Sequence, residues 1–270
     1  MHDKPSMRGL IVNIVYSLTA VIIVIVAWAA LVSYFQVPRY VMPTPMDVVR
    51  HIAEDWRALL KGFWVTFLEF LLGFILGAGA GFIFAVIMDL SRSVRGILYP
   101  ILILSQAIPI VAISAALTIW LGFGLAPKLV IVALVVFFPV VVNVLDGLGS
   151  VDRDVLNLVR AMGASKLTTF RHVKLPATYS PLFSALKLSA TFSVTGAVIA
   201  EWTASTSGGI GAYLLQANSR LNTAGTFAAI AFLGVLGIIS FLLVVATEYL
   251  LTPWKTSSKA RHWSSSYWKG

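Results

Sequence analysis

The sequence predicts an all-α membrane protein with six transmembrane helices, and three observations support this fold class. Hydrophobic residues make up 59% of the 270-residue chain and charged residues only 11%, against about 45–50% and about 25% in an ordinary globular protein. The mean hydropathy is +0.90, so a soluble protein of this size would lack the polar residues to cover its surface. Six apolar stretches are each long enough to cross about 30 Å of hydrocarbon. They are expected at 10–35, 63–88, 97–121, 127–148, 179–200 and 227–251.

The first of these stretches is expected to be a retained helix. Its run from Ala20 to Val32 has no charged or strongly polar residue. It is too long for the core of a signal peptide, and no convincing small-residue cleavage site follows it. We therefore expect an N-terminus at 1–9, a transmembrane domain at 10–251 and a basic tail at 252–270.

The distribution of positive charge predicts that both termini are cytoplasmic. With the N-terminus inside, 13 of the 20 Lys and Arg residues fall on the inner side and six on the outer side, while Lys187 lies within a span. Cytoplasmic loops carry the excess of Lys and Arg in membrane proteins. The formal charge of +9 is thus explained by membrane topology, and no nucleic-acid partner is expected.

The sequence offers no catalytic constellation. It contains no Cys, which excludes thiol catalysis, disulfides and Cys-ligated metals. No carboxylate pair, His cluster or Ser/His/Asp arrangement is present, so neither an enzyme nor a metal site is expected.

Two proline-containing spans are expected to be interrupted. Pro109 should kink the third span beside Ser105 and Gln106, and Pro139 with Asn143 should break the fourth span in a similar way. Interrupted helices with polar side chains at membrane depth are typical of a translocation path, although many membrane helices bend at proline without transporting anything.

The fifth span is the most polar of the six. Ser184, Thr191 and Thr195 lie near one helix face, through steps of seven and four. Their hydroxyls could line a path for a small polar solute, or could bond to neighbouring helices. The candidates for the substrate path are therefore Ser105, Gln106, Asn143, Ser184, Thr191 and Thr195.

The second span carries three glycines at intervals of four, Gly73, Gly77 and Gly81. This pattern predicts a smooth groove for helix packing, with a substrate-lining role as the alternative. Glu69 in the same span is expected to make a structural hydrogen bond, with a substrate contact as the alternative. The preceding segment 45–61 has one apolar face and predicts a short helix, either on the outer interface or packed on the bundle.

One inner segment, 151–176, is long, basic and helix-patterned, and we call it the elbow. Val155, Leu158, Val159 and Met162 have helical spacing, Gly163 interrupts them, and Ser165 can cap a second short helix. Such a helix–Gly–helix unit across the inner end of a bundle suits the docking of a soluble partner.

These residues carry a resemblance to a known family. Gly163, nine further residues and then Val173-Lys174-Leu175-Pro176 resemble the loop of binding-protein-dependent ABC importer permeases. Asn157-Leu158-Val159 stands where that family has Glu-Ala-Ala. The sequences at 42–45, 106–109, 151–152 and 208–211 are similar to the branch that serves nitrate, sulfonates such as taurine, bicarbonate, and pyrimidine or flavin vitamin precursors.

The resemblance implies the type I importer permease architecture in a bacterial inner membrane. It implies two cytoplasmic ATPase subunits, an extracytoplasmic solute-binding protein and a second permease copy, expected to be identical. It also implies that the elbow is the coupling helix that contacts the ATPase. The residues expected to make this contact are Arg160, Ala161, Met162, Gly163, Ala164, Ser165 and Arg171.

The source of energy is expected to lie outside this chain. No Gly-x-x-x-x-Gly-Lys-Ser/Thr sequence occurs, so the chain has no phosphate-binding loop and ATP must be bound by a partner. An ion-coupled transporter is the alternative, and it would need buried ionisable residues, for which Glu69, Lys187 and Glu248 are the candidates.

The predicted spans contain no cluster of Arg residues that would bind a strong anion. Among the cargoes that the resemblance implies, this favours a pyrimidine (thiamine-precursor) or riboflavin-like vitamin, with sulfonate or taurine, nitrate and bicarbonate as alternatives.

Overall fold

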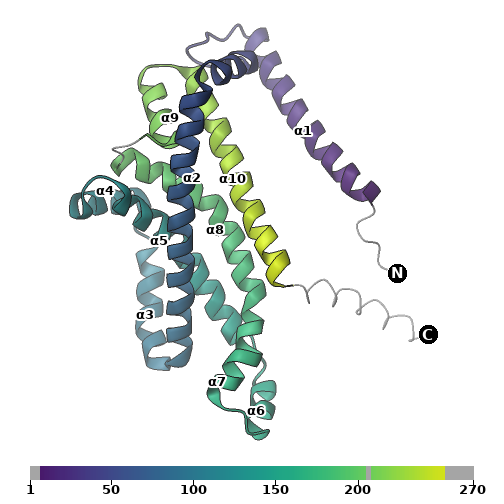
Figure 1. The fold of residues 1–270 in the computed structure, drawn as a ribbon, viewed down its shortest axis with the longest axis vertical. Coiled ribbons are helices and arrows are strands. Elements are labelled where there is room, and N and C mark those ends of the chain that lie inside the picture. Colours follow the sequence, from purple (N-terminus) through teal and green to yellow (C-terminus); the bar gives the residue numbers. More distant parts are fainter. Residues whose placement is uncertain (1–6, 205–207, 253–270) are drawn as a thin grey trace.

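The computed structural model of the chain describes residues 7–204 and 208–252, and every regular element in those ranges is a helix. The basic tail expected at 252–270 lies outside the described residues from 253 onward. Figure 1 shows a bundle of long helices with a small helical unit, α6 and α7, projecting from one end. The helices are α1 (Met7–Tyr34), α2 (Pro45–Leu90), α3 (Arg92–Ser105), α4 (Ile110–Leu121), α5 (Leu125–Gly149), α6 (Arg153–Ala161), α7 (Lys166–Thr169), the π-helical η1 (Phe170–Lys174), α8 (Leu175–Ala204), α9 (Ile210–Ser219) and α10 (Thr223–Leu251).

Four of the described helical stretches are long and apolar enough to cross a membrane. They are Pro45–Leu90, Leu125–Gly149, Lys166–Ala204 and Thr223–Leu251. The bent pair α3 and α4 passes the same test together, which gives up to five within the described residues, and the Thr19–Tyr34 part of α1 is a shorter apolar helix. An all-α membrane fold is confirmed, while the count of six spans stays a prediction.

The centre of the bundle is the packing of α2 against α5 and of α5 against α8. The three glycines of α2 face α5 at very close approach. A Cβ atom on Gly73 would lie 2.6 Å from Val132 Cβ, and one on Gly81 would lie 2.9 Å from the Phe137 carbonyl oxygen. A Cβ atom on Gly77 would overlap the backbone of Ala133. Small residues at these positions let the two helix backbones approach one another closely.

The third expected span is broken rather than merely kinked. α3 ends at Ser105, α4 begins at Ile110, and their axes are bent by 101°. Pro109 is the N-cap of α4, with φ −58° and ψ 128°. Proline lacks the donor that would continue α3, and it disfavours the helical conformation of the residue before it.

The break expected at Pro139 is wrong, because α5 runs without interruption from Leu125 to Gly149. The Asn143 side-chain nitrogen donates a hydrogen bond of 2.8 Å to the Pro139 carbonyl oxygen. Val136, Val140 and Val144 are buried among the neighbouring helices. Tertiary packing on several sides therefore keeps this proline-containing helix continuous, as is common in membrane bundles.

The short outer helix expected at 45–61 is the first part of α2. Thr44 begins it with a capping box: its hydroxyl accepts from the Asp47 amide at 3.2 Å, and its own amide donates to the Asp47 carboxylate at 3.1 Å. Asp55 departs from helical geometry, with φ −115° and ψ 22°, and bends the helix there. Val48 and Leu59 are buried against α9 and α10, so this segment packs on the bundle.

Figure 1 shows which helix ends lie toward each end of the bundle. The start of α1, the end of α10 and the elbow all point toward one end, whereas the start of α2 lies at the opposite end. α1 leans away from the other helices. It meets them near its C-terminal half, where the Trp28 ring stacks on Phe227 with 5.3 Å between centroids.

Candidate functional site

The first half of the elbow is a capped amphipathic helix that ends in a left-handed glycine. The Asp152 carboxylate accepts a hydrogen bond of 2.8 Å from the Asp154 amide and begins α6. Gly163 has φ +85°, a conformation that residues with a Cβ atom rarely adopt. Nothing lies within 4 Å of where its Cβ atom would be. The glycine is therefore required by the turn itself and not by a close neighbour.

The second half of the elbow joins directly to the next span. The Ser165 hydroxyl accepts from the Thr168 amide at 3.2 Å and begins α7, as the sequence predicted. η1 follows without a break and leads into α8, where Pro176 occupies the first turn. Any displacement of the elbow thus acts on the start of α8 through continuous helical backbone.

The tip of the elbow exposes an apolar surface with a basic border. Leu158, Met162 and Leu167 are 63%, 78% and 75% exposed. Arg160 and Arg171 are exposed beside them. Exposed apolar groups of this kind, rimmed by charge, mark interaction sites. Of the seven expected contact residues, Ala164 is half-buried and the others are exposed.

Leu167 was not among the contact residues predicted from the sequence, although it is one of the most exposed leucines of the described residues. It lies two residues after the helix-capping Ser165, within the four-residue helix α7. Its position as an apolar residue just after the capping Ser165, among polar neighbours, could have indicated an exposed contact residue.

Two contacts attach the elbow to the bundle. The half-buried Phe170 packs on a buried cluster that includes Met88, Leu145 and Leu148. The Lys174 ammonium lies 2.9 and 2.8 Å from the two carboxylate oxygens of Asp89, near the end of α2. The elbow therefore contacts α2 and α5 as well as α8.

The hydroxyls predicted on α8 share one exposed face. Ser184, Thr191 and Thr195 are all exposed, whereas Ser189 and Ser193 on another face are buried. The Ser184 hydroxyl donates to the Ser180 carbonyl at 3.0 Å, and the Thr191 hydroxyl to the Lys187 carbonyl at 3.4 Å. The Ser184 and Thr191 hydroxyls thus have acceptors within α8, and all three exposed side chains are available to a surface outside this chain.

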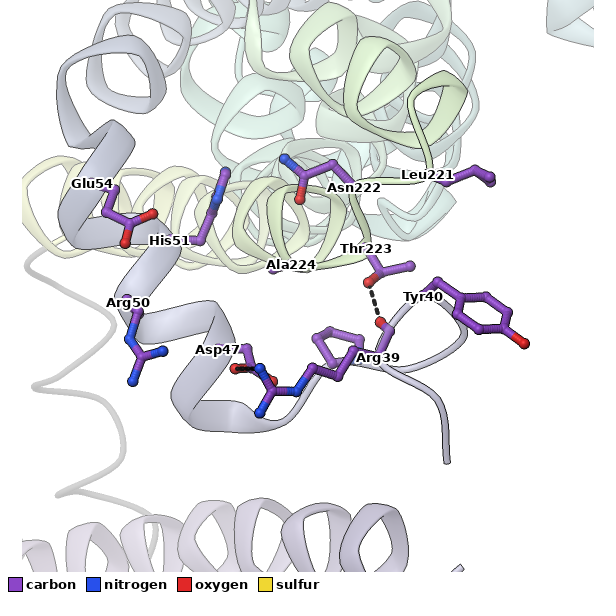
Figure 2. Close-up of a pocket in the computed structure, with 11 residues that line it drawn as sticks. Arg39, Tyr40, Asp47, Arg50, His51, Glu54, Leu221, Asn222, Thr223 and Ala224 are labelled. Carbon is purple, nitrogen blue, oxygen red and sulfur yellow. Dashed lines mark hydrogen bonds and ion pairs between the residues drawn. The ribbon is translucent and has the colours of Figure 1, made fainter. Parts of the chain in front are cut away.

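The remaining path candidates lie elsewhere. Ser105 and Gln106 lie at the break between α3 and α4, where the Ser105 hydroxyl donates to the Leu102 carbonyl at 2.8 Å. Asn143 is half-buried and bonded within α5. None of the six candidates lines the cavity of about 350 Å³ shown in Figure 2.

That cavity lies at the opposite end of the bundle from the elbow. It is an open pocket lined by the loop before α2, the first turns of α2 and the turn before α10 (Figure 2). Arg39 and Asp47 lie 3.7 Å apart within it, and the Thr223 hydroxyl donates to the Arg39 carbonyl at 2.6 Å. Its lining residues are Arg39, Tyr40, Pro43, Asp47, Arg50, His51, Glu54, Leu221, Asn222, Thr223 and Ala224.

A buried network of charges ties four helices together. Glu69 on α2 pairs with Lys128 on α5 at 2.6 Å, in agreement with the structural role expected for Glu69. The Lys128 side chain is almost fully buried within α5. On α8, Glu201 accepts from the Thr66 hydroxyl at 2.5 Å and from the Ala212 amide of α9 at 2.9 Å.

A second polar chain joins the bend of α2 to α9. The Tyr213 hydroxyl donates to Asp55 at 2.6 Å and lies 2.8 Å from His51 Nε2. Burial raises the pKa of the Tyr213 phenol, and the hydrogen bond to Asp55 raises it further. Tyr213 therefore stays protonated and can keep donating to the carboxylate.

The charged residues that an ion-coupled transporter would need are already engaged. Glu69 is paired with Lys128, and Lys187 on α8 forms an ion pair with Glu248 on α10. The candidate coupling residues of that alternative thus stabilise helix contacts.

Comparison with known proteins gives the family. The profile described as "Binding-protein-dependent transport system inner membrane component" matches residues 73–251, which is more than half of the chain and includes the elbow. A probable ABC transporter permease protein of Haemophilus influenzae is 33% identical over 229 residues, which cover 85% of this chain and 92% of that protein.

The names of similar proteins state different cargoes, which include a formylaminopyrimidine, riboflavin, aliphatic sulfonates and taurine. A formylaminopyrimidine transport permease protein of Halalkalibacterium halodurans is 29% identical over 80% of this chain and 86% of its own length. A riboflavin transport system permease protein of Chloroflexus aurantiacus is 29% identical over 87% of this chain and 88% of its own length.

The family consists of transport permeases and not of enzymes, and it implies an ATPase and a solute-binding protein as partners. The apolar helices agree with a multi-pass protein of the inner membrane. The chain therefore belongs to the inner-membrane components of binding-protein-dependent transport systems and is the permease subunit of an ABC importer.

Proposed function

We propose that the elbow is the coupling element, seated in a groove of a cytoplasmic ATPase subunit. The observation that carries this proposal is the exposed apolar tip formed by Leu158, Met162 and Leu167, bordered by exposed arginines. Burying this surface on a partner would remove apolar area from water while leaving the charges at the rim. The contact residues proposed are Arg160, Ala161, Met162, Gly163, Ala164, Ser165 and Arg171.

The connections of the elbow indicate how ATP binding would drive transport. Closure of two ATPase subunits would move two elbows toward each other. Each elbow is joined to α5 at one end and runs into α8 at the other. The inner side of the bundle would then close and the outer side open, an alternating-access motion of packed helices about a central path.

The path itself is proposed to form between two copies of the chain. The exposed hydroxyl face of α8 and the exposed break between α3 and α4 would face a second permease subunit, with Ser184, Thr191 and Gln106 among the lining groups. In this arrangement the termini are cytoplasmic, on the side of the elbow, and a solute-binding protein delivers cargo to the opposite end.

The proposed cargo is a small organic solute, with a pyrimidine (thiamine-precursor) or riboflavin-like vitamin first. Two similar permeases are named for a formylaminopyrimidine and for riboflavin. The exposed polar groups at membrane depth are hydroxyls and an amide, which bind such heterocycles by hydrogen bonds. Sulfonate or taurine, nitrate and bicarbonate are the alternatives. Titration of the partner binding protein with each compound tests this order, and tight binding of an anion alone would reverse it.

The coupling proposal is tested by two substitutions at one position. Gly163→Glu places a charged side chain on the docking surface, and we expect the protein to insert into the membrane but to lose co-purification with its ATPase. Gly163→Asn is the matched control, because Asn tolerates a positive φ and adds no charge, so ATPase binding should persist. Normal import by Gly163→Glu with its ATPase bound would refute the assignment.

A further inference from the structure

The end of α2 is held to the elbow by a partly buried ion pair. The Lys174 ammonium lies 2.9 and 2.8 Å from the two oxygens of Asp89. The two side chains are 22% and 12% exposed. Asp89 is the residue before the end of α2, and Lys174 is the last residue of η1. A charge-assisted contact between two partly buried groups is stronger than a neutral hydrogen bond, so it holds the end of α2 close to η1.

This pair matters because α2 is not adjacent to the elbow in the chain, being separated from it by α3, α4 and α5. The elbow follows α5 and precedes α8 in the chain, so both of these helices feel its displacement through the backbone. α2 is reached through the side chains of Lys174 and Phe170, the latter packed on the cluster that contains Met88. Yet α2 packs along α5 through Gly73, Gly77 and Gly81, so all three helices must move together or this close contact must open.

The segment that carries Lys174 is where displacement of the elbow could be absorbed before it reaches α8. η1 is a π-helical stretch of five residues between the docking tip and α8. Single π-helical turns inside α-helices are local deviations that often lie at functional sites. If η1 were free to bend, displacement of α6 and α7 would be absorbed there. The ion pair between Lys174, the last residue of η1, and Asp89 opposes such bending.

We propose that Asp89 and Lys174 are positioning residues that transmit elbow displacement to α2, so that α2, α5 and α8 turn as one body. This inference rests on the proposed coupling role of the elbow. It adds a second way in which the elbow can move the bundle. Displacement reaches α8 through the backbone, and it reaches α2 through the ion pair between Lys174 and Asp89.

The test uses the full importer, with its ATPase and binding protein, reconstituted in lipid vesicles. The readout is the ratio of binding-protein-stimulated to basal ATP hydrolysis, together with ATPase co-purification. Asp89→Asn and Lys174→Gln should each lower the ratio about fivefold, the lower range of an allosteric coupling, while the ATPase stays bound. Lys174→Arg, which keeps a bidentate partner for Asp89, should retain the ratio, and the exchange Asp89→Lys with Lys174→Asp should recover part of it.

Glu248→Gln is the matched control. It removes the ion pair between Lys187 on α8 and Glu248 on α10, which is also partly buried but does not touch the elbow, and it should leave the ratio unchanged. An unchanged ratio in both Asp89→Asn and Lys174→Gln would overturn the inference, as would an equal fall in Glu248→Gln. If Asp89→Asn does not assemble, the ratios of Lys174→Gln and Lys174→Arg are compared instead. Equal ratios in these two variants would overturn the inference. Failure of the coupling proposal itself would be seen separately, as normal import by Gly163→Glu with its ATPase bound.

Discussion

Lys128 on α5 and Glu69 on α2 form an ion pair of 2.6 Å whose side chains are only 1% and 4% exposed. Taking both charges out of water has a large desolvation cost, which their attraction offsets only while both are present. The pair therefore acts less as a source of stability than as a constraint on how α2 and α5 are aligned. It lies beside the Glu201 network that fixes the start of α9.

Removing one member of this pair should be far more harmful than removing both. Lys128→Met leaves Glu69 buried without its ammonium partner, and we expect the free energy of unfolding to fall by about 3–5 kcal/mol. The double variant Lys128→Met with Glu69→Leu should recover most of that loss. Unfolding in detergent micelles measures the effect. Lys187→Met is the control, since its more exposed pair should contribute less, and an equal loss there would contradict the argument.

Replacement of Thr66 is also expected to lower the free energy of unfolding. Its hydroxyl donates to Glu201 at 2.5 Å, lies 3.1 Å from the Gly62 carbonyl oxygen, and accepts from the Ile210 amide at 2.9 Å. Thr66→Val leaves the amide and a carboxylate oxygen without this partner, which should lower the free energy of unfolding by about 1–3 kcal/mol. Amide hydrogen exchange should rise specifically over α9.

Thr118→Val is the matched control for Thr66→Val. Thr118 is also buried, but its hydroxyl donates to the Ser114 carbonyl of its own helix. Replacement by valine should therefore leave exchange in α9 unchanged. Equal exchange in α9 for the two variants would show that the Thr66 contacts do not hold that helix in place.

Local signals explain what could be predicted from the sequence. The elbow was predicted in detail because a capping serine, a glycine in a left-handed turn and helical spacing act over a few residues. The long apolar stretches likewise predicted α5, α8 and α10 to within a few residues. The glycine spacing of α2 indicated a packing surface, although not that its partner would be α5.

Contacts between distant segments explain what could not be predicted. Lys128 lies near the start of α5, where no neighbouring residue in the sequence marks a partner, yet the packing of α2 on α5 buries it against Glu69. Pro139 was expected to break its helix because proline does so locally, but burial on several sides keeps α5 continuous. The Tyr213–Asp55 bond joins residues 158 positions apart, and no local pattern marks it.

The glycine groove of α2 allows a comparison between two neighbouring positions. A Cβ atom on Gly77 would overlap the Ala133 backbone, whereas nothing lies within 4 Å of one on Gly79. Gly77→Ala should therefore force α2 and α5 apart and lower the free energy of unfolding by about 1–3 kcal/mol. Gly79→Ala should be neutral or stabilising, because alanine favours a helix by about 1 kcal/mol over glycine. Thermal unfolding of the two variants in the same detergent decides, and equal melting temperatures would contradict the packing.

The direction of the chain across the membrane is open to a direct test, because the sequence contains no Cys and single introduced thiols have no background. Arg160 is exposed on the elbow, and the Arg39 side chain is 79% exposed at the opposite end of the bundle. If the elbow meets a cytoplasmic ATPase, a membrane-impermeant maleimide should label Arg39→Cys in intact spheroplasts and Arg160→Cys only in inside-out vesicles. The excess of Lys and Arg on the elbow side favours this orientation, since translocating positive charge is disfavoured. Labelling of Arg160→Cys from outside would place the apolar tip where no ATPase could reach it, and the coupling proposal would fail with it.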